Sequence, residues 1–80
     1  MDIKVLGTGC AKCNKLEALA REVVGELKVK ATVEKVTDLK EIAKTGVFLT
    51  PGLTIDGKIK VSGKLPSKEE LMETIQNSAR

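Results

Sequence analysis

The stretch GTGCAKC, residues 7–13, contains the only two cysteines of the chain, Cys10 and Cys13. Their Cys-x-x-Cys spacing suits three roles: a redox couple, a pair of thiolate ligands for a soft metal, or two small residues of a core. The chain has no histidine and no further cysteine with which to complete a four-ligand zinc site. A disulfide between them would close a very small loop and stabilise the fold little. The pair therefore points to chemistry more than to structure.

The residues around the cysteines predict a strand, a glycine turn and then a helix. Residues 2–6 mix charged and β-branched side chains and stop at Gly7. From Cys10 onward, apolar residues recur at spacings of three and four, which is typical of one face of a helix. This stripe comprises Leu16, Leu19, Ala20, Val23, Val24 and Leu27. Both cysteines are therefore expected on the first turn of a helix.

This position has chemical consequences for the two thiols. Unpaired N–H groups and the positive end of the helix dipole favour a thiolate at Cys10, and Lys12 adds a nearby positive charge. We expect both effects to lower the pKa of Cys10, whose thiolate is the attacking species in disulfide exchange. Cys13 is expected to be less exposed and able to resolve a mixed disulfide. Gly7 and Gly9 are expected to let a substrate backbone come close.

The remaining sequence predicts two helices and three strands. Residues 29–36 alternate as a strand, and residues 38–46 form a short helix with Leu39, Ile42 and Ala43 inward. Strands at 53–55 and 58–61 are joined by an Asp-Gly hairpin loop. A capping box opens a last helix over residues 67–79. The order is β-α-β-α-β-β-α, an α/β fold in one domain, residues 1–80, with a mixed four-stranded sheet and helices on both faces.

These motifs together resemble a known family. GTGCAKC follows a strand, LTPGLTIDGK opens the third strand about 40 residues later, and VSGK precedes the last helix. This arrangement is similar to the thioredoxin fold in its smallest form, found in the small thioredoxin- and glutaredoxin-like redox-active disulfide proteins of prokaryotes. The resemblance covers essentially all 80 residues. It implies a sheet order of 2-1-3-4, with the third strand antiparallel to the first.

The resemblance also implies roles for individual residues. Cys10 would be the nucleophile and Cys13 the resolving thiol. Pro51 would be the cis-proline that family members place beside the disulfide, and Thr50 would offer its backbone to an incoming peptide strand. Gly63 would keep the rim of the site open. Together with the loop before the helix, the candidate substrate-binding residues are Thr8, Gly9, Thr50, Pro51 and Gly63, and Lys12 is the candidate for tuning the pKa of the nucleophile.

The resulting hypothesis is a thiol–disulfide oxidoreductase that reduces disulfides of protein or small-molecule substrates. It needs no cofactor beyond the Cys10–Cys13 couple and no metal, and a thiol or a disulfide reductase must recharge it. We expect a monomer. The alternative is a soft-metal carrier, because GTGCAKC also resembles the GMTCxxC loop of Cu(I)-binding domains. Those domains run β-α-β-β-α-β and have Met where this chain has Thr8. A redox-responsive adaptor without turnover is a third possibility.

Composition narrows the partners. Of the 80 residues, 41% are hydrophobic and 31% charged, and the net charge of +3 comes from lysines spread among acids along the chain. Without a basic block or an aromatic platform, we expect no nucleic-acid partner. No apolar run approaches the roughly 18 residues of a membrane span. The start, MDIKVLGTGC, does not resemble a signal peptide, so the expected location is the cytoplasm.

Overall fold

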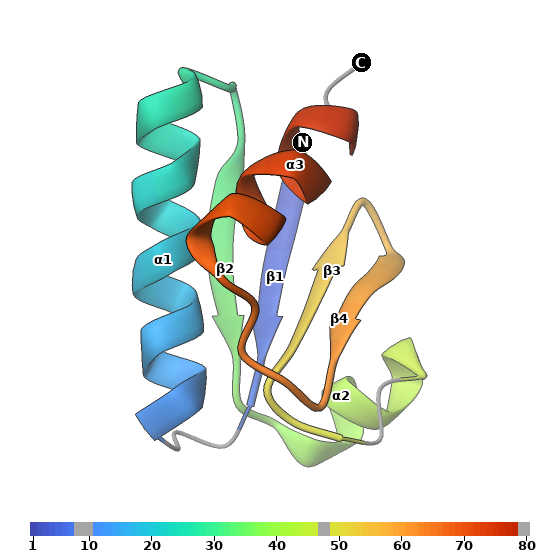
Figure 1. Ribbon diagram of the computed structural model, residues 1–80. Coiled ribbons are helices and arrows are strands. Elements are labelled where there is room, and N and C mark those ends of the chain that lie inside the picture. Colours follow the sequence, from blue (N-terminus) through green and yellow to red (C-terminus); the bar gives the residue numbers. More distant parts are fainter. Residues whose placement is uncertain (8–10, 47–48, 79–80) are drawn as a thin grey trace.

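The order of elements is the β-α-β-α-β-β-α order that the sequence predicts (Figure 1). The computed structural model describes residues 1–7, 11–46 and 49–78. The elements are β1 (Asp2–Leu6), α1 (Ala11–Leu27), β2 (Thr32–Val36), α2 (Leu39–Thr45), β3 (Gly52–Ile55), β4 (Lys58–Ser62) and α3 (Lys68–Ser78). Among the described residues, no helix is both long and apolar enough to cross a bilayer.

The four strands form one mixed sheet in the order β2-β1-β3-β4. β1 runs parallel to β2, because α1 carries the chain back to the same end of the sheet, and antiparallel to β3. β3 and β4 form the predicted hairpin. Its loop residues, Asp56 and Gly57, have φ angles of +51° and +84°, the left-handed conformation that a tight Asp-Gly turn needs. The predicted strand order is confirmed.

Alternation along β1 divides the interior between the two faces of the sheet. Ile3 and Val5 point to the face that α1 and α3 cover, where the main core lies. Leu6 points to the other face and packs with Ile42 of α2. The main core is aliphatic throughout; its buried residues are Ile3, Val5, Leu16, Ala20, Val23, Leu53, Ile55, Val61, Leu71 and Ile75. The helices therefore cover both faces, as predicted.

Two details of the predicted elements are wrong. The second strand begins at Thr32 rather than at residue 29, because the ladder with β1 starts at the pair Asp2–Thr32. Before it, only the backbone of Met1 bonds to Lys30 and Thr32. In α2 Ile42 is buried, whereas Leu39 is 68% exposed and Ala43 is exposed too. A helix of seven residues covers little of the sheet, so one apolar side chain fills its contact with Leu6.

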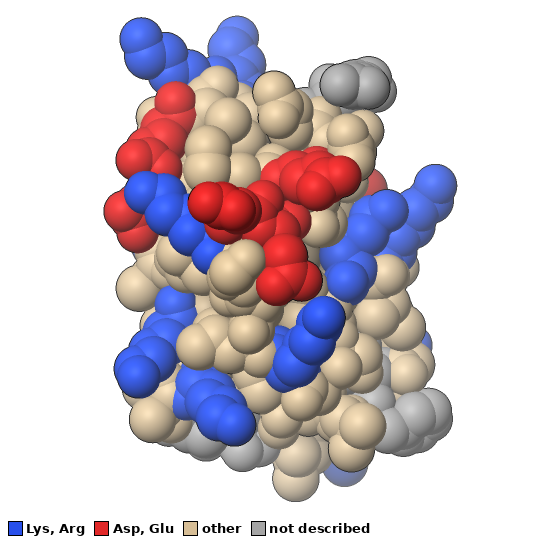
Figure 2. Space-filling model, in the orientation of Figure 1, with Lys and Arg blue, Asp and Glu red and all other residues tan. Residues whose placement is uncertain are grey.

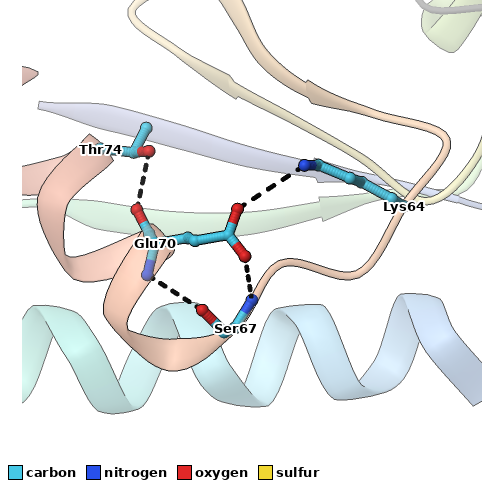
Figure 3. Close-up of polar contacts among 4 residues, drawn as sticks. All are labelled: Lys64, Ser67, Glu70 and Thr74. Atoms are coloured by element: carbon cyan, nitrogen blue, oxygen red, sulfur yellow. Dashed lines mark hydrogen bonds and ion pairs between the residues drawn. The ribbon is translucent and has the colours of Figure 1, made fainter.

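The capping box of α3 forms as predicted (Figure 3). The Glu70 N–H donates to Ser67 Oγ at 3.2 Å, and the Ser67 N–H donates to Glu70 Oε1 at 3.4 Å. Lys64 approaches the same carboxylate, at 3.6 Å. The bonds from Ser67 and then the charge of Lys64 hold the pKa of Glu70 below its ordinary value of 4.5. The start of α3 is therefore stabilised by a charged form of Glu70.

An ion-pair group joins α3 to α1. Lys68, in the first turn of α3, lies 3.2 Å from Glu22 and 2.9 Å from Glu26 of α1. Hydrogen bonds from Lys68 to Glu26 and then to Glu22 raise its pKa above the ordinary value. These groups are exposed, so their contribution to stability is small. Packing of Leu71 and Ile75 against the main core carries most of the contact.

Replacement of a core leucine tests this division between buried and exposed positions. Leu53→Ala removes a fully buried side chain, and we expect the free energy of unfolding to fall by about 2–5 kcal/mol. Leu39→Ala makes the same chemical change at a position that is 68% exposed, and we expect a change within about 0.5 kcal/mol. Urea unfolding of the three proteins measures both values. Equal losses would contradict the assigned core.

The capping box also predicts a dependence on pH. Because the pKa of Glu70 is lowered in the folded state, its stabilising effect is present above about pH 4.5 and is lost as the pH falls through the folded-state value. Glu70→Gln should therefore weaken the fall of stability with acidification in that range. Glu69→Gln removes the same charge from the same turn outside the box and serves as the control. Unfolding curves from pH 7 downward would contradict the assignment if the two variants behaved alike.

Candidate functional site

At one end of the sheet, β1, β3 and β4 are each flanked by a glycine or a proline. Leu6 of β1 pairs with Gly52 of β3, so the residues just beyond this pair, Gly7 and Pro51, lie at the same end of the sheet. The Gly63 N–H donates to the Pro51 carbonyl at 3.0 Å, which extends this row to the end of β4. Figure 1 shows that α1 begins at this end of the molecule. Residues far apart in sequence thus meet around the start of the first helix.

Cys13 lies directly against this row. It is the third residue of α1, it is fully buried, and it continues the inner stripe of the helix one turn before Leu16. A Cβ added to Gly7 would overlap the sulfur of Cys13 and would lie 2.8 Å from its Cβ. The expected role of Gly7 is therefore wrong: Gly7 is buried, and the missing side chain makes room for Cys13 rather than for a substrate backbone. The motif GTGCAKC could have indicated this contact, because its first residue is a glycine placed where the strand ends and the helix with Cys13 is about to begin.

The sulfur of Cys13 is disulfide-bonded in this structure. The three other residues expected in this loop, Thr8, Gly9 and Cys10, lie outside the described residues. Lys12 lies on the exposed side of the first turn of α1. That turn carries no acidic residue, so within it no carboxylate opposes the positive end of the helix dipole.

The segment that enters β3 forms the other wall of the site. The Thr50–Pro51 peptide bond is cis, as the resemblance implies, and Pro51 is buried whereas Thr50 is exposed. Leu49, which the sequence reasoning did not select, is 65% exposed. Gly63 has a φ angle of +80°, and a Cβ there would lie 3.1 Å from the Cβ of Leu49. Glycine at this position thus permits both the turn after β4 and the approach of Leu49.

Apart from Lys12, which is exposed, the predicted site residues that the structure describes fall into two groups. Cys13 meets Gly7 at the end of β1, and Thr50 precedes Pro51, which is bonded to Gly63 across β3 and β4. The two groups are neighbours because Gly7 and Pro51 directly follow the paired residues Leu6 and Gly52. The element order ends in a helix, α3, which differs from the β-α-β-β-α-β order expected of the soft-metal alternative. The arrangement can hold a buried sulfur beside an exposed backbone segment.

Comparison with known proteins agrees with this arrangement. A family model described as a thioredoxin domain matches residues 1–76. A protein named thioredoxin from Methanothermobacter thermautotrophicus is 43% identical over 75 residues, which cover 94% of this chain and 97% of that protein. Another thioredoxin, from Methanocaldococcus jannaschii, is 44% identical over 75 residues, which cover 94% of this chain and 86% of that protein.

The contact between Gly7 and Cys13 predicts the effect of a single methyl group. Gly7→Ala should lower the free energy of unfolding by about 1–3 kcal/mol, because the added Cβ overlaps the Cys13 side chain in a packed interior. Gly25→Ala is the matched control: nothing lies within 4 Å of a Cβ added there. It should gain about 0.5–1 kcal/mol, since alanine favours a helix over glycine. Urea unfolding gives both values, and an unchanged Gly7→Ala protein would refute the assigned contact.

Proposed function

Because the chain belongs to the thioredoxin family, we propose that it is a thiol–disulfide oxidoreductase that works through Cys10 and Cys13. The observation that carries this proposal is the environment of Cys13: a buried, disulfide-bonded sulfur on the first turn of a helix, packed against Gly7 at the end of the central strand. Such a position suits a resolving thiol, which acts inside the protein and does not itself need to meet the substrate.

The reaction proceeds in two exchanges. The Cys10 thiolate attacks one sulfur of the substrate disulfide, forms a mixed disulfide and releases the other substrate sulfur as a thiolate. Cys13, as a thiolate, then attacks the Cys10 sulfur, forms the Cys10–Cys13 disulfide and releases the second substrate sulfur. Two electrons pass from the cysteine pair to the substrate, and the protons lost by the two cysteine thiols balance those taken up by the substrate thiolates.

The exposed wall of the site suits an extended peptide. Thr50 is exposed and precedes Pro51, a position that suits a substrate strand added alongside its backbone. The exposed Leu49 beside Gly63 offers an apolar contact for a substrate side chain. We therefore favour disulfides in proteins as substrates, with Thr8 and Gly9 completing the binding surface.

The couple itself is the only redox group that this mechanism requires. A thiol or a disulfide reductase outside the chain must return Cys10 and Cys13 to the dithiol form after each turnover. The cytoplasm is the proposed location, because thiol pools there keep such couples reduced.

Serine variants of the two cysteines test the order of events. Cys13→Ser should accumulate a mixed disulfide with a protein substrate through Cys10, since the second exchange cannot occur. Cys10→Ser should reduce insulin disulfides no faster than the uncatalysed reaction. Mass spectrometry of the trapped species and turbidity of reduced insulin are the measurements, with the double serine variant as the control.

Equilibration of the native protein in graded dithiol/disulfide buffers tests the couple separately. We expect a reversible two-electron transition, counted as two thiols lost together on oxidation. Full activity in Cys10→Ser would overturn the proposal. Stoichiometric Cu(I) binding without any catalysed disulfide reduction would overturn it too and would favour the soft-metal alternative.

A further inference from the structure

Charged side chains divide α1 into two unlike halves. From Glu17 onward the acids are paired: Glu17 lies 3.0 Å from Arg21, and Lys68 of α3 bridges Glu22 and Glu26. Its first turn and a half carries two exposed lysines, Lys12 and Lys15, and no acid. On the face drawn in Figure 2, acidic side chains gather in the upper and central parts, whereas the lower part shows Lys and Arg without an acid among its coloured residues.

Two further lysines, one from β2 and one from the connection between β4 and α3, lie at the same end. Lys35 of β2 donates from Nζ to Asn14 Oδ1, which places its ammonium beside the first turn of α1. Lys64 follows Gly63, whose N–H is bonded to Pro51. We call Lys12, Lys15, Lys35 and Lys64 the basic rim. Within the described part of the chain, no carboxylate lies within ion-pair distance of the first three.

Apart from Glu34, which precedes Lys35 in β2 and is exposed, the acids near the rim are already engaged. Glu70 lies 3.6 Å from Lys64, an exposed and weak pair, and its carboxylate also serves the capping box. On the α2 side, Asp38 accepts from the Lys40 N–H at the helix cap, and Glu41 lies 3.3 Å from Lys44. The rim therefore presents positive charge toward solvent around the start of α1.

We infer that the basic rim selects protein disulfides that are flanked by acidic residues. This inference rests on the proposed function. A substrate must bring its disulfide to the start of α1, so residues next to that disulfide pass within about 8 Å, the Debye length at physiological salt, of the rim lysines. Opposite charges at that range speed association, and like charges slow it. The substrate class is thus a protein segment with carboxylates beside its disulfide.

Three disulfide peptides that differ only in their flanking residues, Glu, Gln or Lys, test this inference. The measured quantity is the ratio of second-order rate constants for the Glu and Lys peptides, because a change in the intrinsic reactivity of Cys10 cancels in the ratio. At low salt we expect the native protein to favour the Glu peptide by about tenfold or more. The preference should shrink as sodium chloride is added, a measurement that needs no variant.

A matched pair of double variants then locates the effect. Lys12→Glu with Lys15→Glu should abolish or reverse the preference. Lys30→Glu with Lys58→Glu changes the net charge equally at the opposite end of the sheet, near the paired ends Asp2–Thr32 and Ile55–Lys58, and should preserve it. Equal effects of the two double variants, or a ratio near one for the native protein, would overturn the inference.

A neutral substrate separates this inference from the function on which it rests. If 2-hydroxyethyl disulfide is reduced while the three peptides react alike, the basic rim has no role and the oxidoreductase remains. If neither the neutral disulfide nor any peptide is reduced, both proposals fail together.

Discussion

The contact between Cys13 and Gly7 is the constraint around which the site end is organised. A strand and a helix can approach so closely only where one of them lacks a side chain, and Gly7 is that residue. The buried sulfur consequently belongs to both the core and the site. A change that widens the space between β1 and α1 moves the Cys13 sulfur. A change that narrows this space produces a steric clash with it.

The other side of the site depends on backbone rather than on side chains. Pro51 and Gly63 are joined by a main-chain hydrogen bond that continues the β3–β4 ladder by one step. Leu49 then rests on the bare Cα of Gly63. Two glycines at this end of the sheet therefore permit close contacts: Gly7 contacts Cys13, and Gly63 contacts Leu49. A larger residue at either position would hold the neighbouring segment further away.

Local rules explain which features could be predicted from the sequence. The Asp56–Gly57 turn, the box of Ser67 and Glu70 and the stripe of α1 depend on residues near one another in the chain, and each forms as predicted. The resemblance supplied the strand order and the cis bond before Pro51. The start of β2 and the exposure of Leu39 were predicted wrongly, because each depends on the element that packs beside it. The role of Gly7 was also predicted wrongly, because its neighbour Cys13 is close in sequence but the direction of the Cys13 side chain follows from how α1 packs on β1.

The central place of β1 has a consequence for motion at the site. Its backbone is hydrogen-bonded to β2 on one side and to β3 on the other, and the Gly7 N–H adds a bond to the Val36 carbonyl. Segments held on both sides open last, in the same event that opens the whole domain. We therefore expect the Gly7 N–H, directly beneath Cys13, to exchange with solvent as slowly as the amides of β1 itself.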